Sequence, residues 1–134
     1  MDIADQLRLA KKSAAEQKLL ISELNELLKD IERCGRIITD LKTELDKVNS
    51  RHQGPRTTRE DIEYLTGLLA CAKAKLAWEK QLASLQKRTP QALDRLANLL
   101  HDSKNPPAEE TRVEMLRVLH QIQTAMEHLQ KAAT

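Results

Sequence analysis

The chain has 134 residues, of which 40% are hydrophobic and 31% are charged, and its formal net charge is +2 at pH 7. Aromatic residues make up only 1%, whereas a compact globular core usually fills its volume with aromatic side chains. These values exclude an ordinary globule, give no reason to expect a polyanionic partner, and favour one domain built from long helices.

No run of 18 apolar residues occurs, so no membrane-spanning helix is expected, and the stretch MDIADQLRL lacks the pattern of a signal peptide. The two cysteines, Cys34 and Cys71, are spaced for neither a zinc site nor a redox pair. These features favour a reducing compartment inside the cell. We expect a cytoplasmic protein, and we leave open an association with the cytoskeleton or the centrosome.

The first predicted helix covers residues 2–49 and carries the alternating four- and three-residue apolar spacing of a coiled coil. Nine positions follow it without interruption: Leu20, Leu24, Leu27, Ile31, Cys34, Ile38, Leu41, Leu45 and Val48. A different register holds upstream, at Ile3, Leu7, Ala10 and Ala14. The two registers overlap between residues 19 and 28. A helix with two apolar stripes usually has two neighbours, so we expect the early half of this helix to contact two others and its later half one.

Residues 50–57 are the predicted turn. Gly54 and Pro55 form a turn signal, and Thr57 stands three residues before Glu60 in the pattern of a capping box. A second helix is therefore expected over residues 58–88.

Small residues crowd together in this second helix just before Trp78, the only tryptophan: Gly67, Ala70, Cys71, Ala72, Ala74 and Ala77. If the hairpin turns near residue 53 or 54, the numbers of facing residues sum to about 107. Ala70–Ala74 would then face Cys34 and Gly35 in a close seam between two backbones, Trp78 would lie near Leu28 and Lys29, and the two cysteines would be near one another.

Thr89 and Pro90 have the pattern of a new N-cap followed by proline at the first helical position, which predicts a short helix over residues 90–103. The alternative is one long helix kinked at Pro90. Asn105-Pro106-Pro107 ends this segment, and a last helix is expected over residues 107–132. The last helix carries its own apolar stripe: Met115, Leu119, Ile122, Met126, Leu129 and Ala133.

Segment lengths set the predicted architecture. Residues 3–49 and 58–103 would each span roughly 70 Å as helix and, joined by a short loop, should lie antiparallel. The last helix, roughly half as long, turns back beside them. The predicted fold is thus all-α, a single domain over residues 1–134: an elongated antiparallel hairpin or coiled coil that widens to a three-helix bundle, with three or four helices in total.

No arrangement of residues typical of catalysis is visible. The acidic residues alternate with Lys and Arg on what look like solvated helix faces. The four histidines form no metal-binding motif, the cysteines fit small core residues better than nucleophiles, and there is no glycine-rich phosphate loop. We therefore expect no enzyme, no cofactor and no metal site.

Charge is unevenly distributed, since residues 51–90 carry eight Lys and Arg against four Asp and Glu. Arg59, Lys73, Lys80 and Lys87 share the phase of a seven-residue repeat and form a basic stripe. Such a stripe could meet an acidic surface, or it could be a solvated face that balances the first helix. Nucleic acid is disfavoured, because two aromatic residues offer no platform for stacked bases.

A second candidate surface is the stripe Met115, Leu119, Ile122, Met126 and Leu129. Methionine-containing surfaces adapt to varied partners, but the same stripe could instead close the base of the bundle.

The sequence as a whole favours a non-enzymatic scaffold or adaptor domain of a larger intracellular protein, which binds protein partners or a second copy of itself through helix packing. The alternative is a module that uses the basic stripe to bind the cytoskeleton or another anionic surface.

Overall fold

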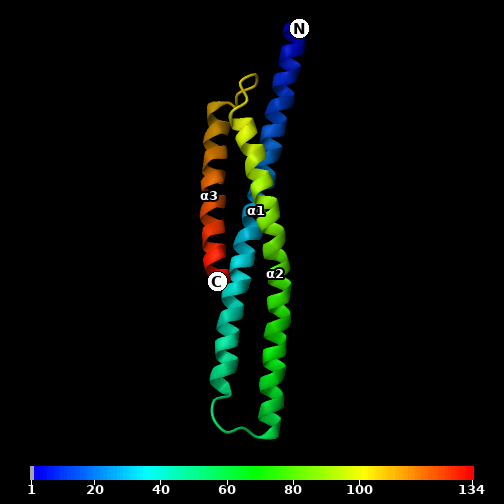
Figure 1. The fold of residues 1–134 in the computed structure, drawn as a ribbon. Coiled ribbons are helices and arrows are strands. Elements are labelled where there is room, and N and C mark those ends of the chain that lie inside the picture. Colours follow the sequence, from blue (N-terminus) through cyan, green and yellow to red (C-terminus); the bar gives the residue numbers. More distant parts are fainter. Residues whose placement is uncertain (1) are drawn as a thin grey trace.

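A computed structural model describes residues 2–134, which form three α-helices and no strand (Figure 1). Helix α1 spans Ile3–Arg51, α2 spans Thr58–Leu100 and α3 spans Glu109–Ala133. Helices α1 and α2 are antiparallel, and α3 runs beside α1 in the same direction (Figure 1). The prediction of an elongated helical hairpin that widens to a three-helix bundle is confirmed. None of these helices is long and apolar enough to cross a membrane.

The core lies in the three-helix part of the molecule, which we call the base. All three helices contribute fully buried side chains to it, among them Leu20, Leu24, Ile31, Ile38, Leu96, Met115, Ile122 and Leu129. The overlap of two apolar stripes in α1 is confirmed as the place where α1 meets both neighbours, since Leu20 and Ile21 are both buried. Beyond the base, α1 and α2 continue alone as a two-helix arm that ends at the 52–57 loop (Figure 1).

The start of α1 projects past the base (Figure 1). Ile3 and Leu7 are exposed, so α3 accompanies α1 only from about Gln17 onward. At that level the side-chain amide of buried Gln17 donates a hydrogen bond to the backbone carbonyl of Asn105, at 3.3 Å, in the loop that leads to α3.

Helix α2 is continuous through Pro90, so the predicted break into helices 58–88 and 90–103 is wrong, and the alternative of one long helix is correct. Proline removes one backbone hydrogen bond and costs about 3 kcal/mol inside a helix. The neighbouring turns offset this cost because Leu85, Thr89 and Leu96 are buried in the base. Packing on both sides of Pro90 thus keeps α2 helical.

The predicted N-cap of α2 at Thr57 is confirmed, whereas the Glu60 carboxylate accepts from the Thr57 hydroxyl at 3.2 Å rather than completing the capping box. Thr57 Oγ1 accepts a hydrogen bond from the backbone N–H of Glu60 at 3.2 Å. The last helix also matches its predicted position. Helix α3 begins at Glu109, and the two acidic residues in its first turn interact favourably with the positive end of the helix dipole.

The predicted register of the hairpin is wrong. Tyr64 Oη donates to Asn49 Oδ1 at 2.9 Å, and a Cβ on Gly67 would come within 3.1 Å of Val48. In the base, Arg95 pairs with Glu23 at 3.1 Å. The numbers of facing residues therefore sum to between 113 and 118 rather than 107.

This shift moves Cys71 about ten residues, or roughly 15 Å, along α1 from Cys34. Trp78 shifts with it, away from the predicted neighbours Leu28 and Lys29 and toward residue 40 of α1. The indole is buried in the same core cluster as Ile38, near the level at which α3 ends.

The loop between α1 and α2 explains the shift. It passes beyond the end of α1 before α2 starts (Figure 1). Arg56 holds it there: its guanidinium donates to the carbonyl of His52 at 2.7 Å and to Asp61 at 2.8 Å, and it stacks over the Tyr64 ring at 4.4 Å. Gly54 supplies the one positive φ angle among the described residues, +85°.

Candidate protein-interaction surface

In the arm, α2 places the small residues Gly67 and Cys71 on its inner side and four large apolar residues on its outer side. Gly67 lies against the buried Val48 of α1, and Cys71, four residues further along the same face of α2, is buried as well. The predicted close seam of Ala70–Ala74 against Cys34 and Gly35 is wrong, since Ala70 and Ala72 are exposed and a Cβ on Gly35 would meet nothing within 4 Å. A close approach to α1 is made instead at Gly67.

Four large apolar side chains on the outer side of α2 are between 56% and 63% exposed. They are Ile62, Leu65, Leu69 and Leu76. With the exposed Ala72, they follow the 3-4-3-4 spacing of a coiled-coil seam over about 21 Å. We call these five residues the α2 stripe. It is the helix face that a partner helix would need, and no helix among the described residues covers it.

The basic stripe borders the α2 stripe on the side away from α1. Lys73 is four residues after Leu69 and three before Leu76, so these side chains are neighbours on one helix face. Arg59, Lys73, Lys80 and Lys87 are all exposed, as expected for a stripe that repeats every seven residues.

Three of the four basic groups make no ion pair with any residue from 2 to 134. Arg59 pairs weakly with Glu63 at 3.4 Å, whereas Lys73, Lys80 and Lys87 are unpaired. The sequence gives the reason: the positions three and four residues away from these lysines hold only Leu, Ala, Ser, Pro and Gln. Several other basic residues do have partners, such as Lys29 with Glu26 and Arg88 with Asp30.

The second predicted surface lies mostly inside the molecule. Met115, Ile122 and Leu129 are fully buried in the base, and Leu119 and Met126 are partly buried against the same core. Of the two roles that the sequence leaves open for this stripe, the structure shows the closing of the bundle. A partner could reach these side chains only if α3 moved away from α1.

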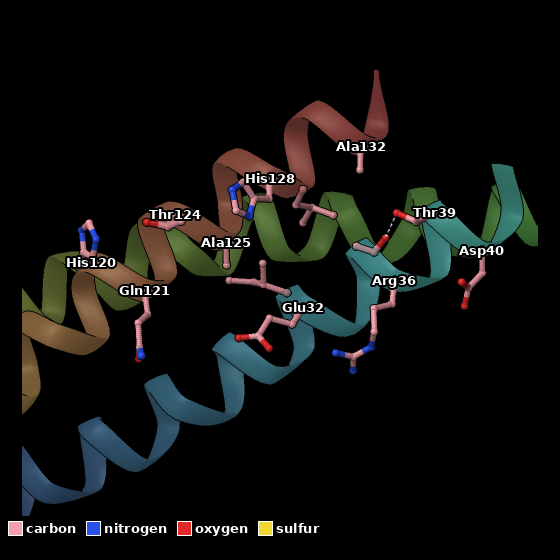
Figure 2. A pocket seen from close by; sticks show the side chains of 13 residues that line it. Glu32, Arg36, Thr39, Asp40, His120, Gln121, Thr124, Ala125, His128 and Ala132 are labelled. Carbon is pink, nitrogen blue, oxygen red and sulfur yellow. Dashed lines mark hydrogen bonds between the residues drawn. The ribbon is translucent and has the colours of Figure 1, made fainter. Parts of the chain in front are cut away.

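A groove of about 630 Å³ runs between α1 and α3. Figure 2 shows Ala125 and Ala132 on the side of α3 that faces α1, whereas Arg36 and Asp40 of α1 point away from α3. Acidic, basic, histidine and small side chains all line this groove, so its charge indicates no particular ligand.

No group of three or more His, Cys, Asp or Glu among the described residues could hold a metal ion. Cys34 and Cys71 are free and buried, and burial raises the pKa of the Cys34 thiol, which disfavours the reactive thiolate. Comparison with protein-family models, with curated proteins and with solved structures gives no match to this chain.

Sequence reasoning located the basic stripe but missed the α2 stripe beside it. The sequence does contain a signal for it, because Ile62, Leu65, Leu69 and Leu76 have the spacing of a coiled-coil seam. The small residues of the same helix drew attention to a different face. Two apolar stripes on α2 carry the same meaning as the two on α1, namely a helix with two neighbours.

Proposed function

We propose that this chain is a non-enzymatic protein–protein interaction domain, the scaffold or adaptor part of a larger intracellular protein, and that it binds its partner by helix packing on the arm. The observation that carries the proposal is the outward placement of Ile62, Leu65, Leu69 and Leu76 beside an inner seam of small residues.

Energetics support this role for the arm. Covering the exposed part of one leucine side chain contributes about 1–2 kcal/mol, since full burial is worth about 1.5–3 kcal/mol. Four such side chains at coiled-coil spacing give a partner helix a continuous apolar seam. In the unbound arm the same side chains contribute little to folding because water still reaches more than half of each surface.

The alternative function is a module that binds the cytoskeleton or another anionic surface. It is favoured by the three unpaired lysines, Lys73, Lys80 and Lys87, which present positive charge at intervals of about 10 Å along one face. The two functions differ in their response to salt. Apolar docking is nearly indifferent to salt, whereas added salt screens the attraction between exposed charges, which at physiological salt is largely lost beyond a Debye length of about 8 Å.

Affinity capture with a matched pair of variants tests the proposal. The test variant carries Leu65→Gln and Leu69→Gln, and the control carries Val113→Gln and Leu116→Gln, which alter two exposed apolar residues on α3. Proteins captured from cell extract by wild type and control are identified, purified and titrated against all three chains at 0.1 and 0.5 M salt.

We expect a partner that binds wild type and control at both salt concentrations and that binds the test variant at least tenfold more weakly. Equal binding to all three chains would refute helix packing on the arm. Binding that survives both leucine substitutions but disappears in 0.5 M salt would favour the alternative function.

A further inference from the structure

We propose that the α2 stripe binds an amphipathic helix whose apolar seam has acidic residues along one edge. This inference rests on the proposed function and names the chemistry of its partner. It depends on two neighbouring features of α2, the apolar stripe and the row of unpaired lysines.

The length of the apolar stripe sets the form of the partner. Ile62 to Leu76 span four turns, and beyond them Glu79 occupies the next seam position, with its carboxylate 3.8 Å from the Lys75 ammonium. A partner of about three heptads, roughly 32 Å of helix, covers this stripe and reaches Lys80. An extended peptide would not match side chains that recur every three and four residues.

The lysines set the charge of the partner and the edge that carries it. Lys73 and Lys80 lie along the outer edge of the stripe, at the flanking positions that face the partner's own flanking residues in a coiled coil. The inner edge carries Leu68 and Lys75, and the ammonium of Lys75 already contacts Glu79. Acidic residues are therefore needed on the outer edge alone, opposite Lys73 and Lys80.

A second copy of this chain is a poor occupant of the stripe. In an antiparallel pair of α2 helices, the flanking positions bring Arg59 of one copy toward Lys80 of the other. In a parallel pair, Lys80 approaches Lys75 of the other copy. Each arrangement places like charges together beside the seam, so self-pairing on this face is opposed by the charges that favour an acidic helix.

Fluorescence anisotropy with synthetic helices tests the inference on the full chain. The probe is a labelled 21-residue peptide with Leu at both seam positions of each heptad, Glu at the flanking position on one edge of the seam, and Ala and Gln elsewhere. The first comparison peptide has Lys in place of every Glu. The second keeps the same number of Glu residues but replaces every Leu by Ser.

The matched protein variants are Lys73→Gln/Lys80→Gln/Lys87→Gln and, as a control with the same loss of charge, a triple Lys→Gln variant of α1. The control changes three exposed lysines near the start of that helix: Lys11, Lys12 and Lys18.

We expect the Glu peptide to bind wild type and control alike, and to bind the α2 lysine variant about tenfold more weakly at 0.1 M salt. The Lys peptide should bind at least tenfold more weakly than the Glu peptide. The inference would be overturned if the Glu peptide and the Lys peptide bound with equal affinity, or if the α2 and α1 lysine variants weakened binding equally. Either result would leave helix packing intact.

Two further outcomes separate this inference from the proposed function. If the Ser peptide binds as tightly as the Glu peptide, the lysines alone bind acidic chains, which overturns the inference in favour of the anionic-surface alternative. If Leu65→Gln/Leu69→Gln leaves binding of the Glu peptide unchanged, the α2 stripe is not the docking face, and the proposed function fails together with the inference.

Discussion

Two leucine-to-alanine substitutions measure whether the α2 stripe is exposed in solution. Leu24 lies in the base and is 0% exposed, whereas Leu69 lies on the arm and is 56% exposed. Both residues are in the interior of a long helix, so the gain in helix propensity from alanine is the same at each. The two variants therefore differ in burial alone.

The expected losses of unfolding free energy are well separated. Leu24→Ala removes a fully buried side chain and leaves a cavity, at a cost of about 3–5 kcal/mol. Leu69→Ala leaves no cavity and removes a side chain less than half covered, at a cost of about 1 kcal/mol or less. With an m-value of about 2 kcal/mol/M, the urea midpoint should fall by about 2 M in the first variant and by less than about 0.5 M in the second.

Urea titration followed by circular dichroism at 222 nm gives both midpoints, and light scattering gives the mass at the same protein concentration. An equal loss in the two variants would refute the reasoning, because Leu69 would then be covered in the free protein. A mass near 30 kDa together with that result would identify a second copy as the cover, since the chain is 15.2 kDa. A small loss for Leu24→Ala would instead contradict the three-helix base.

Other features of the structure give four further expectations. Pro90→Ala should raise the unfolding free energy by about 1–3 kcal/mol in urea titration, because it restores a helical hydrogen bond and removes a clash; a loss would contradict the continuous α2. Thr57→Ala should cost about 1 kcal/mol in the same assay through loss of the N-cap, and no change would mean that the cap contributes nothing. Burial raises the pKa of Cys34, so the folded chain keeps a proton that the unfolded chain releases at alkaline pH; stability should fall as pH rises above the ordinary thiol pKa, and Cys34→Ala should reduce that fall. Glu23→Cys with Arg95→Cys, in a chain whose native cysteines are replaced by alanine, should be joined within one chain by a short bis-maleimide; the two native cysteines should not.

The sequence was sufficient for the fold where large apolar residues dominate. In α1, the stripe from Leu20 to Ile38 is buried as its spacing predicts, and the overlap of two stripes correctly marks the base. The position of α3 followed from Pro106-Pro107 and from the spacing of its own apolar residues. These features depend on local or periodic patterns, so they can be predicted from a single sequence.

The register of the hairpin could not be read in the same way. It depends on how Arg56 holds the 52–57 loop beyond the end of α1, through contacts with His52, Asp61 and Tyr64. Counting residues from the middle of the turn misses that displacement. Pro90 was misjudged for a related reason, since the burial of Leu85 and Leu96 on both sides of it is a tertiary effect.

The residue composition of α2 does not by itself predict which of its faces contacts α1. In the arm the inner seam uses Gly67 and Cys71, and the outer face carries the leucines, so the stronger apolar signal marks the face that α1 leaves uncovered. In the base, α1 and α2 share their core with α3, which supplies Met115, Ile122 and Leu129. On our proposal, a partner helix would pack on the face of α2 opposite α1, so α2 would lie between two helices in the arm. The arm would then acquire a second apolar seam only in the complex. The amide hydrogens of α2 in the arm should exchange faster than those of the base in the free chain, and they should slow on binding.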